Sequence, residues 1–130
     1  MNRPRRDPRV LLAWLQGLYF FATGVWPLLH MASFVAVTGP KVDLWLVKTA
    51  GVLIAAIGAT LLLGARRRTV GPELAFLAVA SAAGLAGIDL VYALAGRISG
   101  VYLLDAIAEI GLILLWGIAW AYARRRSPAP

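Results

Sequence analysis

The sequence contains no cysteine and a single histidine, and these two absences remove several classes of site. Without cysteine, this chain forms no disulfides, carries out no thiol redox chemistry and offers no thiolate to a metal ion. With His30 as the lone imidazole, one chain supplies no multi-histidine metal or haem site. We therefore expect no bound metal ion and no other cofactor.

Charged residues are also scarce, at 15% of the 130 residues, whereas hydrophobic residues make up 61%. Soluble domains have an apolar share of about 45–50%, and a soluble core of this size could not hide the excess. The surroundings must therefore be partly lipid. Four spans of about 20 residues each account for most of the chain and leave no room for a separate soluble domain. The sequence predicts an all-α, integral membrane four-helix bundle.

Helix-start and helix-end residues place the four spans. Asp7 and Asp43 are suited to N-caps, and Gly64 and Gly96 are suited to helix ends. Residues 1–30 could instead be a signal peptide, but their apolar stretch is too long and no cleavage site follows. The predicted segments are a basic arm at 1–9, spans at 10–29, 44–64, 73–95 and 101–123, an interfacial stretch at 30–43 and a tail at 124–130.

Basic residues are distributed unevenly between the two ends of the predicted bundle. Lys41 and Arg97 lie at one end and Lys48 falls inside the second span, whereas the other ten of the 13 lie at the opposite end. The positive-inside rule then puts both termini in the cytoplasm and predicts a multi-pass protein of the cell inner membrane. Because these arginines flank apolar runs, we expect contact with membrane lipids and none with nucleic acid. The ten are Arg3, Arg5, Arg6, Arg9, Arg66, Arg67, Arg68, Arg124, Arg125 and Arg126.

Aromatic and small residues complete the predicted packing. Tryptophan and tyrosine near the ends of the spans are expected to anchor the chain at the two interfaces. Small residues on the second and third spans allow helices to approach closely, either each other or a second copy in a homo-oligomer. The aromatic set is Trp14, Trp116, Trp120 and Tyr122 at the inner side and Trp26, Trp45 and Tyr102 at the outer side; the small set includes Gly51, Ala55, Gly58, Ala78, Ala82, Gly84 and Gly87.

Ionisable residues inside the spans are the most informative feature of the sequence. An ionisable residue near the membrane centre costs about 2.5–3.5 kcal/mol on insertion scales, so it usually faces a partner, a cavity or a pathway. Asp89 lies toward the C-terminal part of its helix, where the helix dipole disfavours a carboxylate, and we expect Lys48, His30 or a tyrosine hydroxyl as its partner. Asp105 and Glu109 lie one helical turn apart and share a face with Tyr102.

These polar residues fall in the outer half of the predicted bundle, and the acids outnumber the bases. At least one acid must therefore be protonated, bind a cation or meet a cationic ligand. We predict an outward-facing pocket that binds or transports a lipid-like, amphipathic or cationic small molecule. The predicted lining residues are Asp89, Glu109, Asp105, Lys48, His30, Tyr92, Tyr102, Trp26 and Trp45.

Two alternatives remain open. In the first, the chain is an accessory membrane subunit whose ion pairs only fix helix packing, with Lys48 reaching the outer surface and Asp105 favoured by its helix dipole. In the second, which the absence of a nucleophile motif disfavours, the chain is an enzyme acting on a lipid or isoprenoid with an acid and His30 as acid and base.

Residues 14–64 contain a distinctive series of short sequence motifs: WPLLH at 26–30, SF at 33–34, TGPK at 38–41, then Asp43 and WLVKT at 45–49. This series resembles a group of small four-span bacterial membrane proteins with no assigned activity, and the resemblance implies a bacterial inner-membrane protein. The layout of four spans with buried acids is also similar to DoxX-like proteins and to the EXPERA superfamily. That similarity is architectural, and it carries over no site residue.

Overall fold

The computed structural model describes residues 6–126, which form five helices and no strand. Four helices are long and apolar enough to cross a membrane, which agrees with the predicted all-α bundle of a multi-pass membrane protein. Residues 1–5 of the predicted arm and 127–130 of the predicted tail lie outside the described part. The helices are α1 (Pro8–Leu29), α2 (Met31–Thr38), α3 (Leu44–Arg66), α4 (Pro72–Leu94) and α5 (Val101–Arg126).

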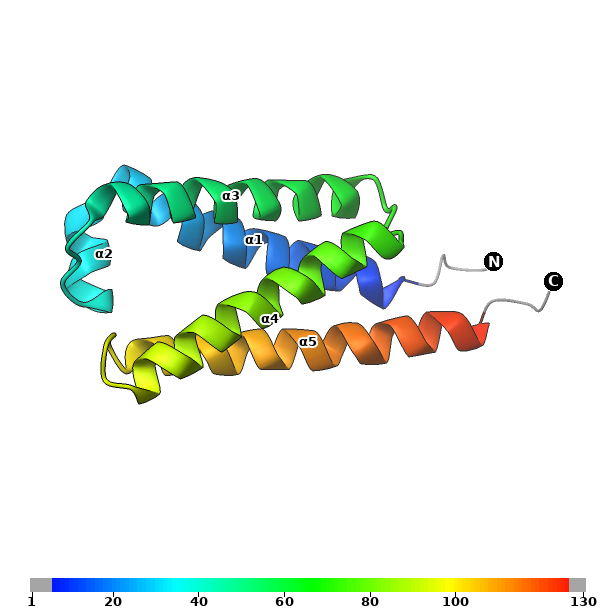
Figure 1. Ribbon diagram of the computed structural model, residues 1–130. Helices are drawn as coiled ribbons and strands as arrows, with labels where there is room; N and C mark the ends of the chain where they lie inside the picture. The colour runs from blue at the N-terminus through cyan, green and yellow to red at the C-terminus, as the bar shows by residue number, and fades with distance from the viewer. Residues whose placement is uncertain (1–5, 127–130) are drawn as a thin grey trace.

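The four long helices form two antiparallel pairs (Figure 1). Helix α1 packs along α3, and α4 packs along α5, whereas contacts between the two pairs are fewer. The short helix α2, which falls in the predicted interfacial stretch, folds across one end of the bundle (left in Figure 1). The turn between α3 and α4 lies at the opposite end, where α1 begins and α5 ends. The two ends of the bundle are therefore built differently.

The helix ends follow local chemistry. Oδ1 of Asp7 accepts a hydrogen bond of 2.9 Å from the backbone N–H of Arg9 and caps α1. Asp43 precedes α3 but makes no hydrogen bond to the helix with its side chain. Helix α3 continues past Gly64 to Arg66, because the chain turns at Arg68, which has a φ of 54°.

Glycines bring α1 and α3 into close contact. A Cβ at Gly24 would lie 2.5 Å from the backbone nitrogen of Ala55, and a Cβ at Gly58 would lie 2.5 Å from that of Phe21. Only a hydrogen atom fits at these positions. The sequence assigned Gly58 to a contact with the third span or a second copy, but its partner here is α1, because α1 carries its own glycines at matching positions.

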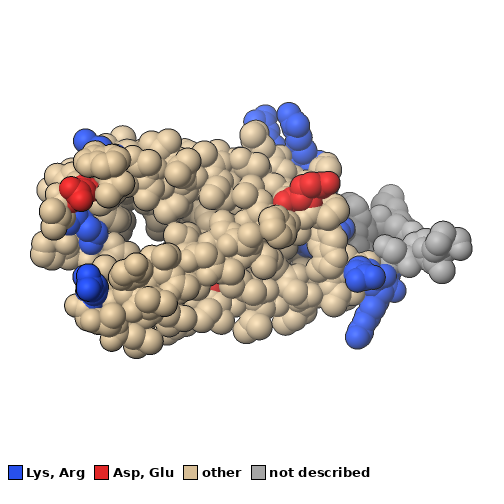
Figure 2. Space-filling view, viewed as in Figure 1, with Lys and Arg blue, Asp and Glu red and all other residues tan. Residues whose placement is uncertain are grey.

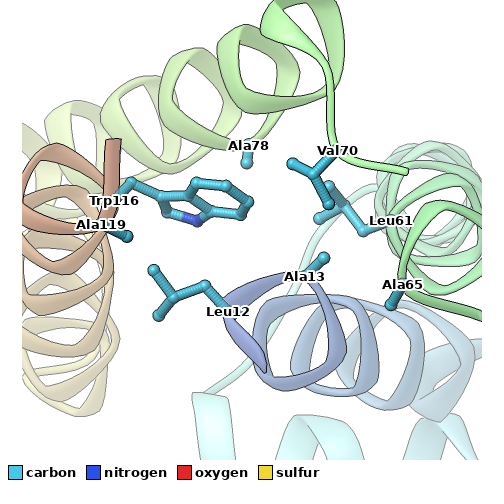
Figure 3. Close-up of a cluster of buried hydrophobic side chains, with 8 residues drawn as sticks. All are labelled: Leu12, Ala13, Leu61, Ala65, Val70, Ala78, Trp116 and Ala119. Atoms are coloured by element: carbon cyan, nitrogen blue, oxygen red, sulfur yellow. The ribbon is translucent and has the colours of Figure 1, made fainter. Parts of the chain in front are cut away.

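The end of the bundle where α1 begins and α5 ends is filled by a hydrophobic cluster to which α1, α3, α4, α5 and the α3–α4 turn all contribute (Figure 3). Trp116 is only 1% exposed and donates its Nε1 hydrogen to Oε1 of Gln16 at 2.8 Å. The prediction that Trp116 anchors the chain at the membrane surface is therefore wrong, since Gln16 supplies an internal acceptor for its indole N–H. The cluster comprises Leu12, Ala13, Leu61, Ala65, Val70, Ala78, Trp116 and Ala119.

Candidate ligand cavity

The half of the bundle nearer to α2 is hollow. A cavity of about 530 Å³ lies between the α1–α3 pair and the α4–α5 pair, with α2 at its end. Figure 2 views the bundle across its helices and shows the surface hollowed between the two pairs toward this end, so the hollow faces the side of the bundle. Most lining side chains are apolar. The polar ones are Tyr19, Thr23, Trp26, Thr38, Lys41, Asp89, Tyr102, Asp105 and Glu109.

Two carboxylates on the cavity wall are almost fully buried. Asp89 on α4 is 6% exposed and Glu109 on α5 is 1% exposed. Oδ2 of Asp89 and Oε2 of Glu109 accept no hydrogen bond from any residue between 6 and 126. A buried polar atom without a partner is costly. These two oxygens therefore mark positions where a donor brought by a ligand would be stabilised.

The third carboxylate of the cavity, Asp105, is half-buried and has a partner. The hydroxyl of Tyr19 on α1 donates a hydrogen bond to Oδ1 of Asp105 on α5. A tyrosine hydroxyl was one of the partners predicted for Asp89. In the structure a tyrosine hydroxyl instead donates its hydrogen bond to Asp105. Tyr19 was not among the predicted lining residues, because it lies within an apolar run of the sequence. The spacing of Tyr19 and Thr23, one helical turn apart, was the available signal for a polar face on this span.

The cation of the cavity is Lys41 and not Lys48. Nζ of Lys41 donates hydrogen bonds to the backbone carbonyls of Thr38, at 3.0 Å, and Gly39, at 3.1 Å. Lys48 is exposed and does not line the cavity. Val47 lines it instead, since one residue turns a helix by about 100°. Lys41 was not among the predicted lining residues, because nothing in the sequence showed that α2 would fold back over the end of the bundle.

Lys41 also lies against aromatic rings that belong to the cavity wall. Its Nζ is 5.1 Å from the ring centre of Tyr102 and 5.9 Å from that of Phe34, and both distances allow cation–π attraction. Tyr102 is on α5 and Phe34 on α2, so the ammonium group is held where these two helices meet. The positive charge is thereby fixed at the α2 end of the cavity.

His30 lies outside the cavity and caps α2. Its Nδ1 accepts a hydrogen bond of 3.2 Å from the backbone N–H of Ser33, and the imidazole is exposed. Trp26 does line the cavity, and its Nε1 donates to Oγ of Ser33 at 2.8 Å. Trp45, at 65% exposure, and Tyr92, at 43%, do not line it. Of the residues that the sequence assigned to the pocket, the structure therefore brings together Asp89, Asp105, Glu109, Tyr102 and Trp26.

The three carboxylates do not converge into a metal site. Within residues 6–126, no group of three histidine, aspartate or glutamate side chains is placed so that it could hold a metal ion. The cavity offers buried acceptors and a fixed cation, an arrangement that suits recognition of charged hydrogen-bonding groups. No family model, curated protein or solved structure matches this chain, so the resemblance seen in residues 14–64 stays a prediction.

Proposed function

We propose that this protein binds an amphipathic amine in its lateral cavity. The observation that carries the proposal is that Oδ2 of Asp89 and Oε2 of Glu109 accept no hydrogen bond from residues 6–126, although both are buried on the wall of a mainly apolar cavity. A protonated amine supplies the missing N–H donors and a compensating positive charge. An alkyl tail covers the apolar wall and leaves through the side of the bundle, where lipid lies.

The geometry supports binding more directly than transport. Transport would also require the end around Trp116 to open, and that end is closed by the packed cluster and the hydrogen bond to Gln16. The accessory-subunit alternative relies on ion pairs between span residues. Among residues 6–126 the one ion pair joins Arg9 to Asp7, at 2.9 Å and away from the cavity. A ligand site accounts better for the buried carboxylates.

Direct titration tests the proposal. The purified protein, in phosphatidylcholine nanodiscs, is titrated with dodecylamine and with dodecanol, which has the same alkyl chain but no charge. We expect tighter binding of dodecylamine. Asp89→Asn and Glu109→Gln should each weaken it about tenfold, or about 1.4 kcal/mol, and leave dodecanol binding unchanged.

The chain offers matched controls for both substitutions. Asp43→Asn and Glu73→Gln make the same chemical changes at exposed positions outside the cavity, and they should leave dodecylamine affinity intact. If the double variant Asp89→Asn/Glu109→Gln binds dodecylamine as tightly as the unmodified protein does, the proposal is wrong.

We further propose that the protein lies in a bacterial inner membrane with both termini in the cytoplasm, so that the cavity belongs to the outer half. Arg66, Arg67 and Arg68 support this orientation, since they lie where α3 ends, and α3 and α5 both end on the side of the bundle opposite to α2 (Figure 1). Because the chain has no cysteine, single substitutions can be labelled cleanly. A membrane-impermeant maleimide should label Gly100→Cys in intact cells and Arg67→Cys only after permeabilisation. The reverse pattern would contradict the orientation.

A further inference from the structure

The cavity wall carries a positive group, Lys41, that has no anionic partner among residues 6–126. An ammonium group has three N–H donors, and Lys41 gives hydrogen bonds to two backbone carbonyls, those of Thr38 and Gly39. No carboxylate between residues 6 and 126 lies within ion-pair distance of its Nζ. Lys41 lines the cavity, and its third N–H makes no hydrogen bond to residues 6–126, so a ligand at the α2 end can use this donor and the positive charge.

The two kinds of charge lie at different depths. Lys41 is fixed beside Tyr102, and Glu109 follows seven residues later on α5, which is about 10 Å further along the helix axis at 1.5 Å per residue. The lining thus carries Lys41 at the α2 end, then Asp105, which Tyr19 already occupies, and then the carboxyl group of Glu109 deeper in the cavity. A ligand with an amine alone would satisfy the deep end and leave Lys41 without an anionic partner.

We propose that the ligand has a zwitterionic headgroup, with its protonated amine at Asp89 and Glu109 and an anionic oxygen group, such as a phosphate ester, at Lys41. This inference rests on the proposed amine site and adds a second recognition element to it. A phosphate oxygen accepts the remaining Lys41 donor in a charge-assisted hydrogen bond. An amphipath with a phosphoethanolamine headgroup carries both groups on one molecule, and its alkyl chain suits the apolar wall.

The same geometry selects against a quaternary amine. Within residues 6–126, Oδ2 of Asp89 and Oε2 of Glu109 accept no hydrogen bond, and a trimethylammonium group has no N–H to donate to them. Such a headgroup would keep the charge but leave both buried oxygens unpaired, which is heavily penalised in recognition. A phosphocholine amphipath should therefore bind more weakly than its phosphoethanolamine counterpart.

Three probes with the same alkyl chain test the inference: dodecylamine, dodecyl phosphoethanolamine and dodecyl phosphocholine. We expect the phosphoethanolamine probe to bind most tightly, at least tenfold more tightly than the phosphocholine probe. Lys41→Met should lower affinity for the phosphoethanolamine probe about tenfold and leave dodecylamine affinity unchanged or higher. Lys48→Met removes an exposed lysine outside the cavity and should change neither affinity.

The outcomes separate this inference from the amine site on which it rests. Lys41→Met and the unmodified protein could bind the phosphoethanolamine probe with equal affinity while dodecylamine binding still depends on Asp89 and Glu109. This result would overturn the proposal of a zwitterionic headgroup and leave the amine site standing. Loss of that dependence would overturn both proposals. Lys41→Arg keeps the charge and should restore affinity, so failure of this variant to rescue binding while it remains folded also counts against the role of Lys41.

Discussion

The hydroxyl of Tyr19 donates a hydrogen bond to Oδ1 of Asp105 and so joins α1 to α5 across the cavity. This contact distinguishes Asp105 from its two neighbours, since Oδ2 of Asp89 and Oε2 of Glu109 accept no hydrogen bond from residues 6–126. One carboxylate thus holds the two helix pairs together. We propose that the oxygens of the other two pair with a ligand.

Removal of the Tyr19 hydroxyl tests this division of roles. Tyr19→Phe should lower the free energy of unfolding by about 1.5–3 kcal/mol, the usual contribution of a hydrogen bond to a charged group. Tyr92→Phe removes a hydroxyl from an exposed tyrosine outside the cavity and serves as the control. Denaturant unfolding of both variants in the same detergent gives the comparison. Equal stabilities would show that the Tyr19 contact does not hold the pairs together.

The glycine contacts between α1 and α3 give a second prediction. Gly24→Ala would place a Cβ 2.5 Å from the backbone nitrogen of Ala55, so the helices would have to separate. We expect a loss of about 1–3 kcal/mol or more, because overpacking against backbone has no side chain that can move away. At Gly84 a Cβ meets no atom within 4 Å, and Gly84→Ala should be neutral or stabilising by up to about 1 kcal/mol. Thermal unfolding of the two alanine variants tests this prediction. A similar loss of stability in both variants would contradict the close α1–α3 contact.

Gln16 connects three helices in the packed half of the bundle. Its Nε2 donates to the carbonyl of Ala78 at 2.9 Å, and its Oε1 accepts from Trp116 at 2.8 Å. Gln16→Leu should cost about 1–3 kcal/mol, because it leaves the buried indole N–H without an acceptor. In Trp116→Phe that donor is absent, so adding Gln16→Leu to it should cost less. A double-mutant cycle with a coupling energy near zero would contradict this pairing.

Asp7 makes stability depend on pH at the start of α1. The side-chain hydrogen bond from Arg9 lowers the pKa of Asp7 below its usual value of 3.8. The folded state therefore favours the ionised form, and the stabilisation is present above pH 3.8 and disappears as the pH falls through the lowered pKa. Because Asp7 is partly exposed, solvent reduces the effect, and Asp7→Asn should cost less than about 1 kcal/mol at pH 7. The difference in thermal unfolding temperature between the unmodified protein and Asp7→Asn should be smaller at pH 3 than at pH 7. If this difference stays constant with pH, the ion pair between Asp7 and Arg9 is not its source.

The fold class followed from the sequence because lipid imposes strong rules on composition and span length. Apolar runs bounded by Pro72, Gly96 and the arginine clusters identified the long helices. The buried acids were also identifiable, since Asp89 and Glu109 have no low-energy position in a span unless they face the protein interior.

The choice of partner residues could not be predicted in the same way. Whether Lys41 or Lys48 lines the cavity depends on how α2 folds back and on the rotation of α3, which its close contact with α1 fixes. Likewise, His30 caps α2 because Ser33 lies one turn later, a local contact that competes with any role in the pocket. The position of Lys41 depends on long-range packing, about which a single sequence carries little information.

The proposed binding site requires a ligand that pairs with the buried carboxylates. Native mass spectrometry of the protein purified from its own membrane, with identification of co-purifying small molecules, tests this most directly when applied to the unmodified protein, Asp89→Asn and Glu109→Gln. We predict a bound amphipath with a protonatable amine in the unmodified protein and its loss from both variants, whereas Asp43→Asn retains it. The same ligand in all four proteins, or none in any, would contradict the account.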